Sequence, residues 1–191
     1  MGTTRTPRER WVEAGLQALA EGGPDAVRVE ALAKSLGVSK GGFYGFYADR
    51  DALLEAMLDS WEKQSTDDVI ERVDREGGDP ISKARRAGQL TFSHDRLLPI
   101  DLAVRDWARR EPTVAERLRR VDNRRMELLR ETIRTFCSDE EEVEARSLLC
   151  FCVAIGAHFL AADHPGSTRD EVVARAGDLL LGLQRLAVPR E

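Results

Sequence analysis

The segment SKGGFYGFY, residues 39–47, holds the side chains of this chain best suited to contacting another molecule. Phe43 and Tyr47 stand four residues apart, so on a helix they share one face, and we expect that face to lie against a core. Outward positions are then taken by Lys40, Gly42, Tyr44 and Phe46. A lysine ammonium can donate to O6 and N7 of guanine, and glycine lets a backbone approach closely. This chemistry is that of binding, with no nucleophile.

Residue constellations for catalysis are missing from the sequence. It contains no paired carboxylates, Ser/His/Asp or Cys/His arrangement, or phosphate-binding loop. The three histidines lack metal-ligand spacing, and Cys150 and Cys152 would point about 200° apart on one helix. We therefore expect no enzyme, cofactor or metal. A helical enzyme that uses residues 39–47 only for packing is the alternative, and it would show no duplex specificity.

Two short helices joined by a glycine turn position this segment. The first carries an apolar stripe at the i, i+3, i+4 and i+7 positions, namely Val29, Leu32, Ala33 and Leu36. Gly37 follows where helices often end in a left-handed residue, and Ser39 is a good N-cap for the second. A preceding helix over 8–21 ends at Gly22-Gly23-Pro24 and completes a three-helix core. Helix, tight turn and helix form the helix-turn-helix layout, whose second helix enters the major groove of DNA.

At this point the sequence resembles the N-terminal domain of tetracycline-repressor-family (TetR) transcriptional regulators. The resemblance covers about the first 60 residues, in a pattern containing LGVSKGxFYxxYxxRxxLL. The matching residues are Ala14, Leu32, Ala33, Leu36, Gly37, Val38, Ser39, Lys40, Gly41, Phe43, Tyr44, Tyr47, Arg50, Leu53 and Leu54.

The resemblance implies roles for individual residues. It puts the Tyr44 hydroxyl and Arg50 on DNA phosphates and makes Lys40 and Gly42 the positions nearest base edges. The family often has His where this chain has Phe46, which can only pack or contact a thymine methyl or sugar. The expected DNA-binding residues are Arg28, Ser39, Lys40, Gly41, Gly42, Tyr44, Phe46 and Arg50. The family often has a threonine at the start of the second helix, where this chain has Val27 and Arg28. Arg28 can replace the hydrogen bond of the threonine hydroxyl to a phosphate with a charged contact. Core packing of Tyr44 and simple solvation of Lys40 remain alternatives.

The rest of the chain is predicted to be helical. Gly and Pro breaks favour helices over 49–75, 81–95, 100–110, 113–136, 139–163 and 168–187, about nine in total with the first three. No segment alternates as a strand would. We expect an all-α fold with two domains: a helix-turn-helix DNA-binding domain over 1–48, and a helical ligand-binding and dimerisation domain over 49–191.

Two sets of residues in the second domain follow from apolarity together with the resemblance. Residues 147–162 are apolar around nearly the full circumference, which indicates burial on all sides. Family members dimerise through their last two helices, and the expected interface residues are Ala154, Gly156, Ala157, Ala161, Val172, Ala176, Leu179, Leu180 and Leu183. Family members also bind small molecules, and the candidate pocket residues are Phe92, His94, Trp107, Met126, Phe151, His158 and Phe159. An ordinary helical core would contain the same residue types as this pocket set.

Composition agrees with a regulator. The 191 residues are 42% hydrophobic and 33% charged, with a net charge of −5, of which residues 1–50 carry +1. A near-neutral head suits a few well-placed phosphate contacts rather than coating of nucleic acid. No signal peptide or membrane span is evident, so cytoplasmic residence is expected. The predicted function is a homodimeric repressor on palindromic double-stranded DNA, released by a hydrophobic or amphipathic ligand. The alternatives are a helical DNA-binding protein without an inducer, or an activator.

Overall fold

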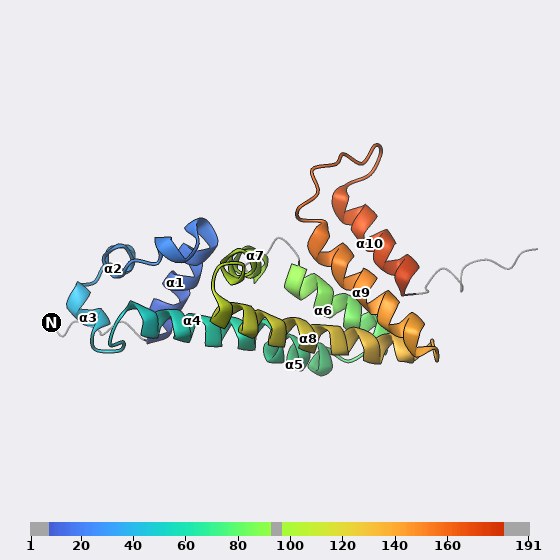
Figure 1. Ribbon diagram of the computed structural model, residues 1–191, viewed down its shortest axis with the longest axis horizontal. Coiled ribbons are helices and arrows are strands. Elements are labelled where there is room, and N and C mark those ends of the chain that lie inside the picture. The colour runs from blue at the N-terminus through green and yellow to red at the C-terminus, as the bar shows by residue number, and fades with distance from the viewer. Residues whose placement is uncertain (1–7, 93–96, 182–191) are drawn as a thin grey trace, which may run out of the picture. The chain divides into compact units, whose positions relative to one another are not determined.

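The computed structural model describes residues 8–92 and 97–181, and within these ranges the chain is all-α with no strand (Figure 1). The all-α prediction is confirmed. The helices are α1 (Arg8–Gly22), the 3-10 helix η1 (Pro24–Ala26), α2 (Val29–Leu36), α3 (Lys40–Phe43), α4 (Arg50–Ser65), α5 (Asp67–Glu76), α6 (Pro80–Phe92), α7 (Leu97–Ala108), α8 (Pro112–Arg134), α9 (Glu140–Gly156) and α10 (Arg169–Leu180). They form two compact units.

The first unit comprises residues 1–69 and 93–121. Helix α1 lies at its centre, in contact with α2, α4 and α7. Trp11, Phe43 and Trp61 are fully buried and anchor its core. Because α4 and α7 pack directly on α1, this compact unit is larger than the three-helix head expected over residues 1–48.

Helix α4 is tied to the start of α8 by charged side chains within the first unit. Arg117 forms ion pairs with Glu55 and Asp59, both at 2.7 Å, and with Glu62 at 3.3 Å. Burial works against the charge of Arg117, yet hydrogen bonds to Asp59 and Glu55 raise its pKa above the ordinary value. The guanidinium therefore joins one acidic face of α4 to α8.

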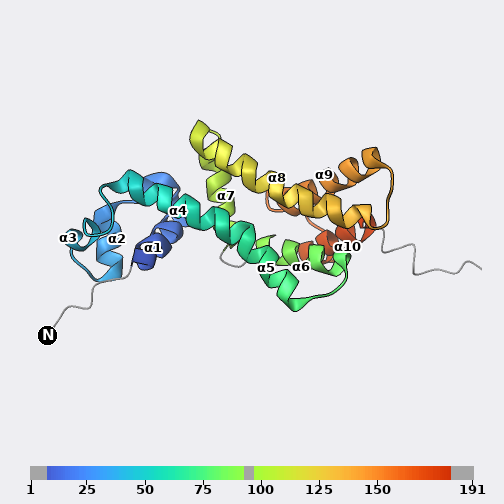
Figure 2. The ribbon, with the colours of Figure 1, turned by 90° about the horizontal axis from the view of Figure 1, so that it is seen from below.

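The second unit comprises residues 70–92 and 122–191, and among its described residues fewer large apolar side chains are buried than in the first unit. Helices α6, α9 and α10 lie side by side (Figures 1 and 2). One buried cluster is formed by Ile133, Val143 and Leu181, with Ile81, Cys137 and Cys150 packed against it. Helix α10 has no buried residue between Arg169 and Leu180. Within the described part of this unit, the apolar side chains of α10 are therefore half-buried or exposed.

The structure corrects several expected helix boundaries. The helix expected over 49–75 is divided at Thr66, whose φ of −127° and ψ of −81° are not helical and whose hydroxyl donates to the Glu62 carbonyl at 2.8 Å. The expected break at Pro99 is wrong. This proline lies in the first turn of α7, where its missing N–H needs no helical partner. The helix expected over 139–163 ends at Gly156, and the connection over 157–168 is mostly exposed from Phe159 onward.

In the parts of the chain that are described, no helix combines the length and apolarity needed to cross a membrane.

Candidate nucleic-acid interface

The turn between α2 and α3 is built as the glycine position predicts. Gly37 has a φ of +68° and a ψ of 29°, the left-handed conformation that glycine adopts without a side-chain penalty. The Val38 N–H donates to the Ala33 carbonyl at 2.9 Å and closes the end of α2. Ser39 takes the N-cap position of α3, but its side chain makes no capping hydrogen bond. The turn thus rests on backbone bonds and leaves the Ser39 side chain exposed.

Two aromatic side chains hold the α3 region against the core of the first unit. Phe43 is fully buried and packs edge-on against Trp11, with ring centroids 5.3 Å apart. Tyr47 is also buried and stacks on Phe43 at 5.5 Å. The inward direction expected for Phe43 and Tyr47 is confirmed. Since α3 is only four residues long, this packing fixes its orientation more than helix propensity does.

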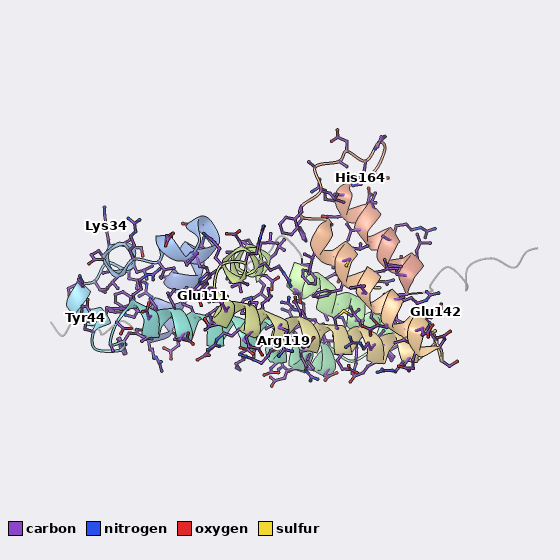
Figure 3. The ribbon with its side chains drawn as sticks, viewed as in Figure 1. Lys34, Tyr44, Glu111, Arg119, Glu142 and His164 are labelled. Atoms are coloured by element: carbon purple, nitrogen blue, oxygen red, sulfur yellow. The ribbon has the colours of Figure 1, made fainter. Side chains whose placement is uncertain are left out.

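Lys40 and Tyr44 face the opposite way, into solvent. Tyr44 is 54% exposed, and Figure 3 labels it at the end of α3. The Lys40 ammonium forms an ion pair with Glu30 of α2. The hydrogen bond to Glu30 and its charge raise the pKa of Lys40, and the same bond lowers the pKa of Glu30. Both residues are therefore charged over the physiological pH range.

The fold of the chain does not require glycine at positions 41 and 42, at the start of α3. A Cβ built at Gly42 would meet no atom within 4 Å, and one at Gly41 would meet only the Ser39 hydroxyl oxygen at 3.7 Å. Neither glycine has a positive φ. The fold would accept alanine at both positions, so a requirement for glycine here must come from something that approaches the helix from outside.

The two arginines of the expected set differ in their surroundings. Arg28 is exposed, and its Nε donates to the Asp25 carbonyl at 3.1 Å. Arg50 is half-buried; its Nε donates to the Val27 carbonyl at 2.8 Å and its Nη2 to the Pro24 carbonyl. The Arg50 guanidinium thereby closes the connection that precedes α2. Phe46, also half-buried, packs against the core of the first unit.

The expected pocket residues are distributed over both units. Phe92 and Phe151 meet edge-on at 6.1 Å in the second unit, and the Arg125 guanidinium lies 5.3 Å from the centroid of the Phe92 ring. Met126 is buried and His158 half-buried in the same unit. Trp107 instead packs against the core of the first unit, and Phe159 is 67% exposed. His94 lies outside the described residues.

The expected interface residues are only partly exposed. Leu179 and Ala161 face solvent, whereas Ala157 is buried. Half-buried positions are taken by Ala154, Gly156, Val172, Ala176 and Leu180. Leu183 lies outside the described residues. Leu148 and Leu149 of α9 are 53% and 50% exposed but are not among the interface residues expected from the sequence, because a continuous apolar run does not reveal which side faces outward.

Comparisons with known proteins agree with this geometry. The family described as bacterial regulatory proteins, tetR family, matches residues 12–57. A comparison of sequences with curated proteins found no match. Among solved structures, a transcriptional regulator from Rhodococcus sp. Rha1 is 23% identical, with 96% of this chain and 100% of that chain covered and a TM-score of 0.68.

Two further solved structures share the fold over most of their length. A protein from Saccharomonospora viridis, solved in complex with choline, is 18% identical over 91% of this chain and 94% of its own, with a TM-score of 0.74. The fatty acid degradation regulator FadR from Bacillus halodurans is 19% identical over 92% of this chain and 98% of its own, with a TM-score of 0.66. At these identities the likeness establishes the fold.

Proposed function

Because residues 12–57 make this chain a member of the tetR family of bacterial regulatory proteins, we propose that it is a homodimeric repressor that binds a palindromic operator through α2 and α3. One observation carries the proposal. Lys40 and Tyr44 are exposed beside Gly42, a glycine that the fold itself does not need. A cation, a hydroxyl and an open backbone on one short, firmly packed helix suit insertion into a major groove.

The residues of this surface take different parts in DNA binding. Lys40 donates to a base edge, while Gly41 and Gly42 let the backbone come close to the groove wall. Hydroxyl groups of Tyr44 and Ser39 donate to phosphates. Arg28 supplies a charged phosphate contact from the start of α2, and Arg50 contributes charge to the same region. Phe46 contacts a sugar or thymine methyl with its outer edge.

Dimerisation through α9 and α10 is supported by the apolar side chains that these helices leave exposed. Leu148 and Leu149 of α9 and Leu179 of α10 are each at least half exposed. Helix α10 carries an apolar stripe including Val172 and Ala176, yet no residue between Arg169 and Leu180 is buried. Such a surface needs an apolar partner. A second copy of the chain is the partner that would also supply the second half of a palindromic contact.

A small-molecule effector is the third part of the proposal. Phe92 and Phe151 meet edge-on in the second unit and Met126 is buried there, and side chains of these types suit a hydrophobic or amphipathic ligand. To release the protein from DNA, the ligand must bind better to a conformation that binds DNA poorly. DNA and ligand then weaken each other's binding by the same factor. In the alternative, a DNA-binding protein without an inducer, no small molecule would weaken the binding of DNA.

The test is binding to a duplex that covers the DNA upstream of the protein's own gene. We expect salt-sensitive wild-type binding that a Lys40→Ala, Tyr44→Phe double variant loses by tenfold or more, since one charge and one phosphate hydrogen bond are removed (~1.5–3 kcal/mol for the latter). Fluorescence anisotropy at several salt concentrations measures this.

A Lys34→Ala, Tyr47→Phe variant is the matched control. It removes one exposed cation from α2 and one hydroxyl that faces the Arg8 carbonyl at 3.4 Å rather than solvent. This control should bind nearly as well as wild type. A monomeric wild type, or equal losses in both double variants, would overturn the assignment of the surface.

A further inference from the structure

Glu30 is not among the DNA-binding residues expected from the sequence. It nevertheless forms an ion pair with one of them, Lys40. Glu30 stands in the first turn of α2 and Lys40 in the first turn of α3. Side-chain exposures are 67% for Glu30 and 49% for Lys40. The pair therefore bridges the two starting turns of the helix-turn-helix on its solvent side.

Stability of the fold does not account for this ion pair. Exposed pairs contribute little because water screens the charges and two long side chains lose freedom. The hydrogen bond between them nevertheless shifts both groups toward their charged forms, lowering the pKa of Glu30 and raising that of Lys40. Tyr44, the exposed residue that directly follows α3, adds to the shift at Lys40. The three side chains thus form one charged and polar surface.

A carboxylate on a DNA-binding surface has a defined chemistry. It has no proton to donate and can only accept hydrogen bonds, so phosphates repel it. In the major groove, the exocyclic amine of cytosine is a donor that carboxylates accept from, and O6 and N7 of guanine are acceptors for lysine. A joined ammonium and carboxylate therefore match the two halves of a G·C pair.

We propose that Glu30 is a specificity-determining residue, which together with Lys40 recognises a G·C base pair in each half-site. The inference rests on the proposed function. Lys40 donates to guanine and Glu30 accepts from the cytosine on the opposite strand. An A·T pair matches less well at both contacts, because adenine offers the ammonium only N7 and places an amine where guanine has O6, while the thymine O4 faces the carboxylate. Glu30 also holds Lys40 in position and reduces its attraction to phosphates of any sequence.

The experiment is selection of binding sites from a random duplex library by wild type and by Glu30→Gln. Wild type is expected to select a palindrome with an invariant G·C pair in each half-site. Glu30→Gln is expected to select the same palindrome with that one position relaxed. The matched control is Glu21→Gln, which removes an equal charge from the exposed end of α1, where Glu21 is bonded to Gln17; it should reproduce the wild-type sites in full.

Anisotropy on two duplexes, with G·C or A·T at that position, then measures the effect. We expect wild type to prefer G·C by roughly tenfold or more, and Glu30→Gln by much less. A uniform gain in affinity for both duplexes, with a steeper salt dependence, would mean that Glu30 only neutralises Lys40 and would overturn the proposal. Selection of an A·T pair at that position would overturn it equally. Failure of wild type to select any palindrome would instead refute the proposed function.

Discussion

Arg50 and Tyr44 occupy motif positions that the family associates with phosphate contacts, but their side chains have different surroundings. Tyr44 is 54% exposed and open to a partner. Arg50 donates to the carbonyls of Val27 and Pro24 and thereby ties the start of α4 to the segment before α2. Arg50 can therefore stabilise the fold as well as contact DNA. Substitutions can separate its contribution to stability from its contribution to DNA affinity.

Replacing Arg50 by methionine is expected to lower the stability of the first unit. The Val27 carbonyl loses the Arg50 donor, and the Pro24 carbonyl keeps only the Val27 N–H, at a cost of about 1–3 kcal/mol. Arg50→Lys, which keeps the charge but cannot reach both carbonyls with a planar fork, should lose part of that stability while retaining the salt dependence of DNA binding. Chemical denaturation measures the first effect and anisotropy the second. If Arg50→Met unfolded like wild type and only DNA affinity fell, the arginine would be a phosphate ligand rather than a structural one.

At the scale of elements, the close approach of α1 to α4 sets the shape of the first unit. Gly15 of α1 is buried, and a Cβ there would lie 2.5 Å from the Met57 sulfur of α4. Met57 is itself fully buried and has little room to move. Glycine at position 15 is therefore a packing requirement, in contrast to the glycine at position 42.

Opposite effects are expected for alanine at these two glycines. Gly15→Ala should destabilise the protein by about 1–3 kcal/mol through overpacking against Met57. Gly42→Ala should stabilise it by about 0.5–1 kcal/mol, because alanine loses less backbone freedom in a helix, while weakening DNA binding. Thermal unfolding and anisotropy on the same samples provide the measurement. Tighter DNA binding by Gly42→Ala would contradict the close approach proposed for this backbone.

Helix α10 begins with a capping box that responds to pH. The Thr168 hydroxyl accepts from the Glu171 N–H, and the Glu171 carboxylate accepts from the Thr168 N–H at 2.7 Å. Hydrogen bonds from the backbone and hydroxyl of Thr168 lower the pKa of Glu171. Because the folded-state pKa is lowered, the stabilisation is fully present above the ordinary carboxyl pKa and disappears as the pH falls through the lowered value.

The expected result is a pH-dependent difference between wild type and Glu171→Gln. The variant should be less stable at neutral pH, and the two proteins should converge in acid, once the wild-type carboxylate is protonated. Denaturation curves at a series of pH values measure the difference. A gap that persisted unchanged into strong acid would show that the glutamine affects packing rather than the cap.

At the scale of the whole molecule, the proposal assigns DNA binding to the first unit and dimerisation to the second. Their surfaces differ in kind: Lys40, Glu30 and Tyr44 are polar, while Leu148 and Leu149 on α9 are apolar. Cys152 is exposed on the same face of α9 as these leucines, since it follows them by four and three residues. Its accessibility therefore reports on whether a partner covers α9.

Alkylation of the cysteines distinguishes a covered face from an open one. Burial raises the pKa of Cys150 to about 11, so this thiol should react slowly at mildly alkaline pH. Cys152 should be protected at protein concentrations that favour the proposed dimer, and should react quickly in Leu148→Glu, which places a charge on the apolar face. Peptide mass spectrometry after timed iodoacetamide treatment reads both sites. Rapid labelling of Cys152 in a wild-type dimer would place the interface elsewhere.

Local patterns in the sequence were sufficient for the helix-turn-helix and for the class of protein. Apolar spacing from Val29 to Leu36, the left-handed position of Gly37 and the inward pair Phe43 and Tyr47 are properties of neighbouring residues, so they are readable without a structure. Helix ends set by unusual geometry were less predictable. Pro99 lies in the first turn of α7, where proline is tolerated, and the break at Thr66 accompanies non-helical dihedrals and a hydroxyl bond to Glu62, so neither boundary follows from counting Gly and Pro breaks.

Only the tertiary structure decided which partners the individual side chains have. Glu30 and Lys40 are ten residues apart, and Arg50 meets carbonyls more than twenty residues away. Trp107 and Phe151, both candidate pocket residues in the sequence, belong to different units. Periodicity specifies the face of a helix, whereas burial and pairing depend on which helices meet across the fold. The sequence by itself therefore determined the DNA-binding fold, and the structure determined how its charged and aromatic residues are used.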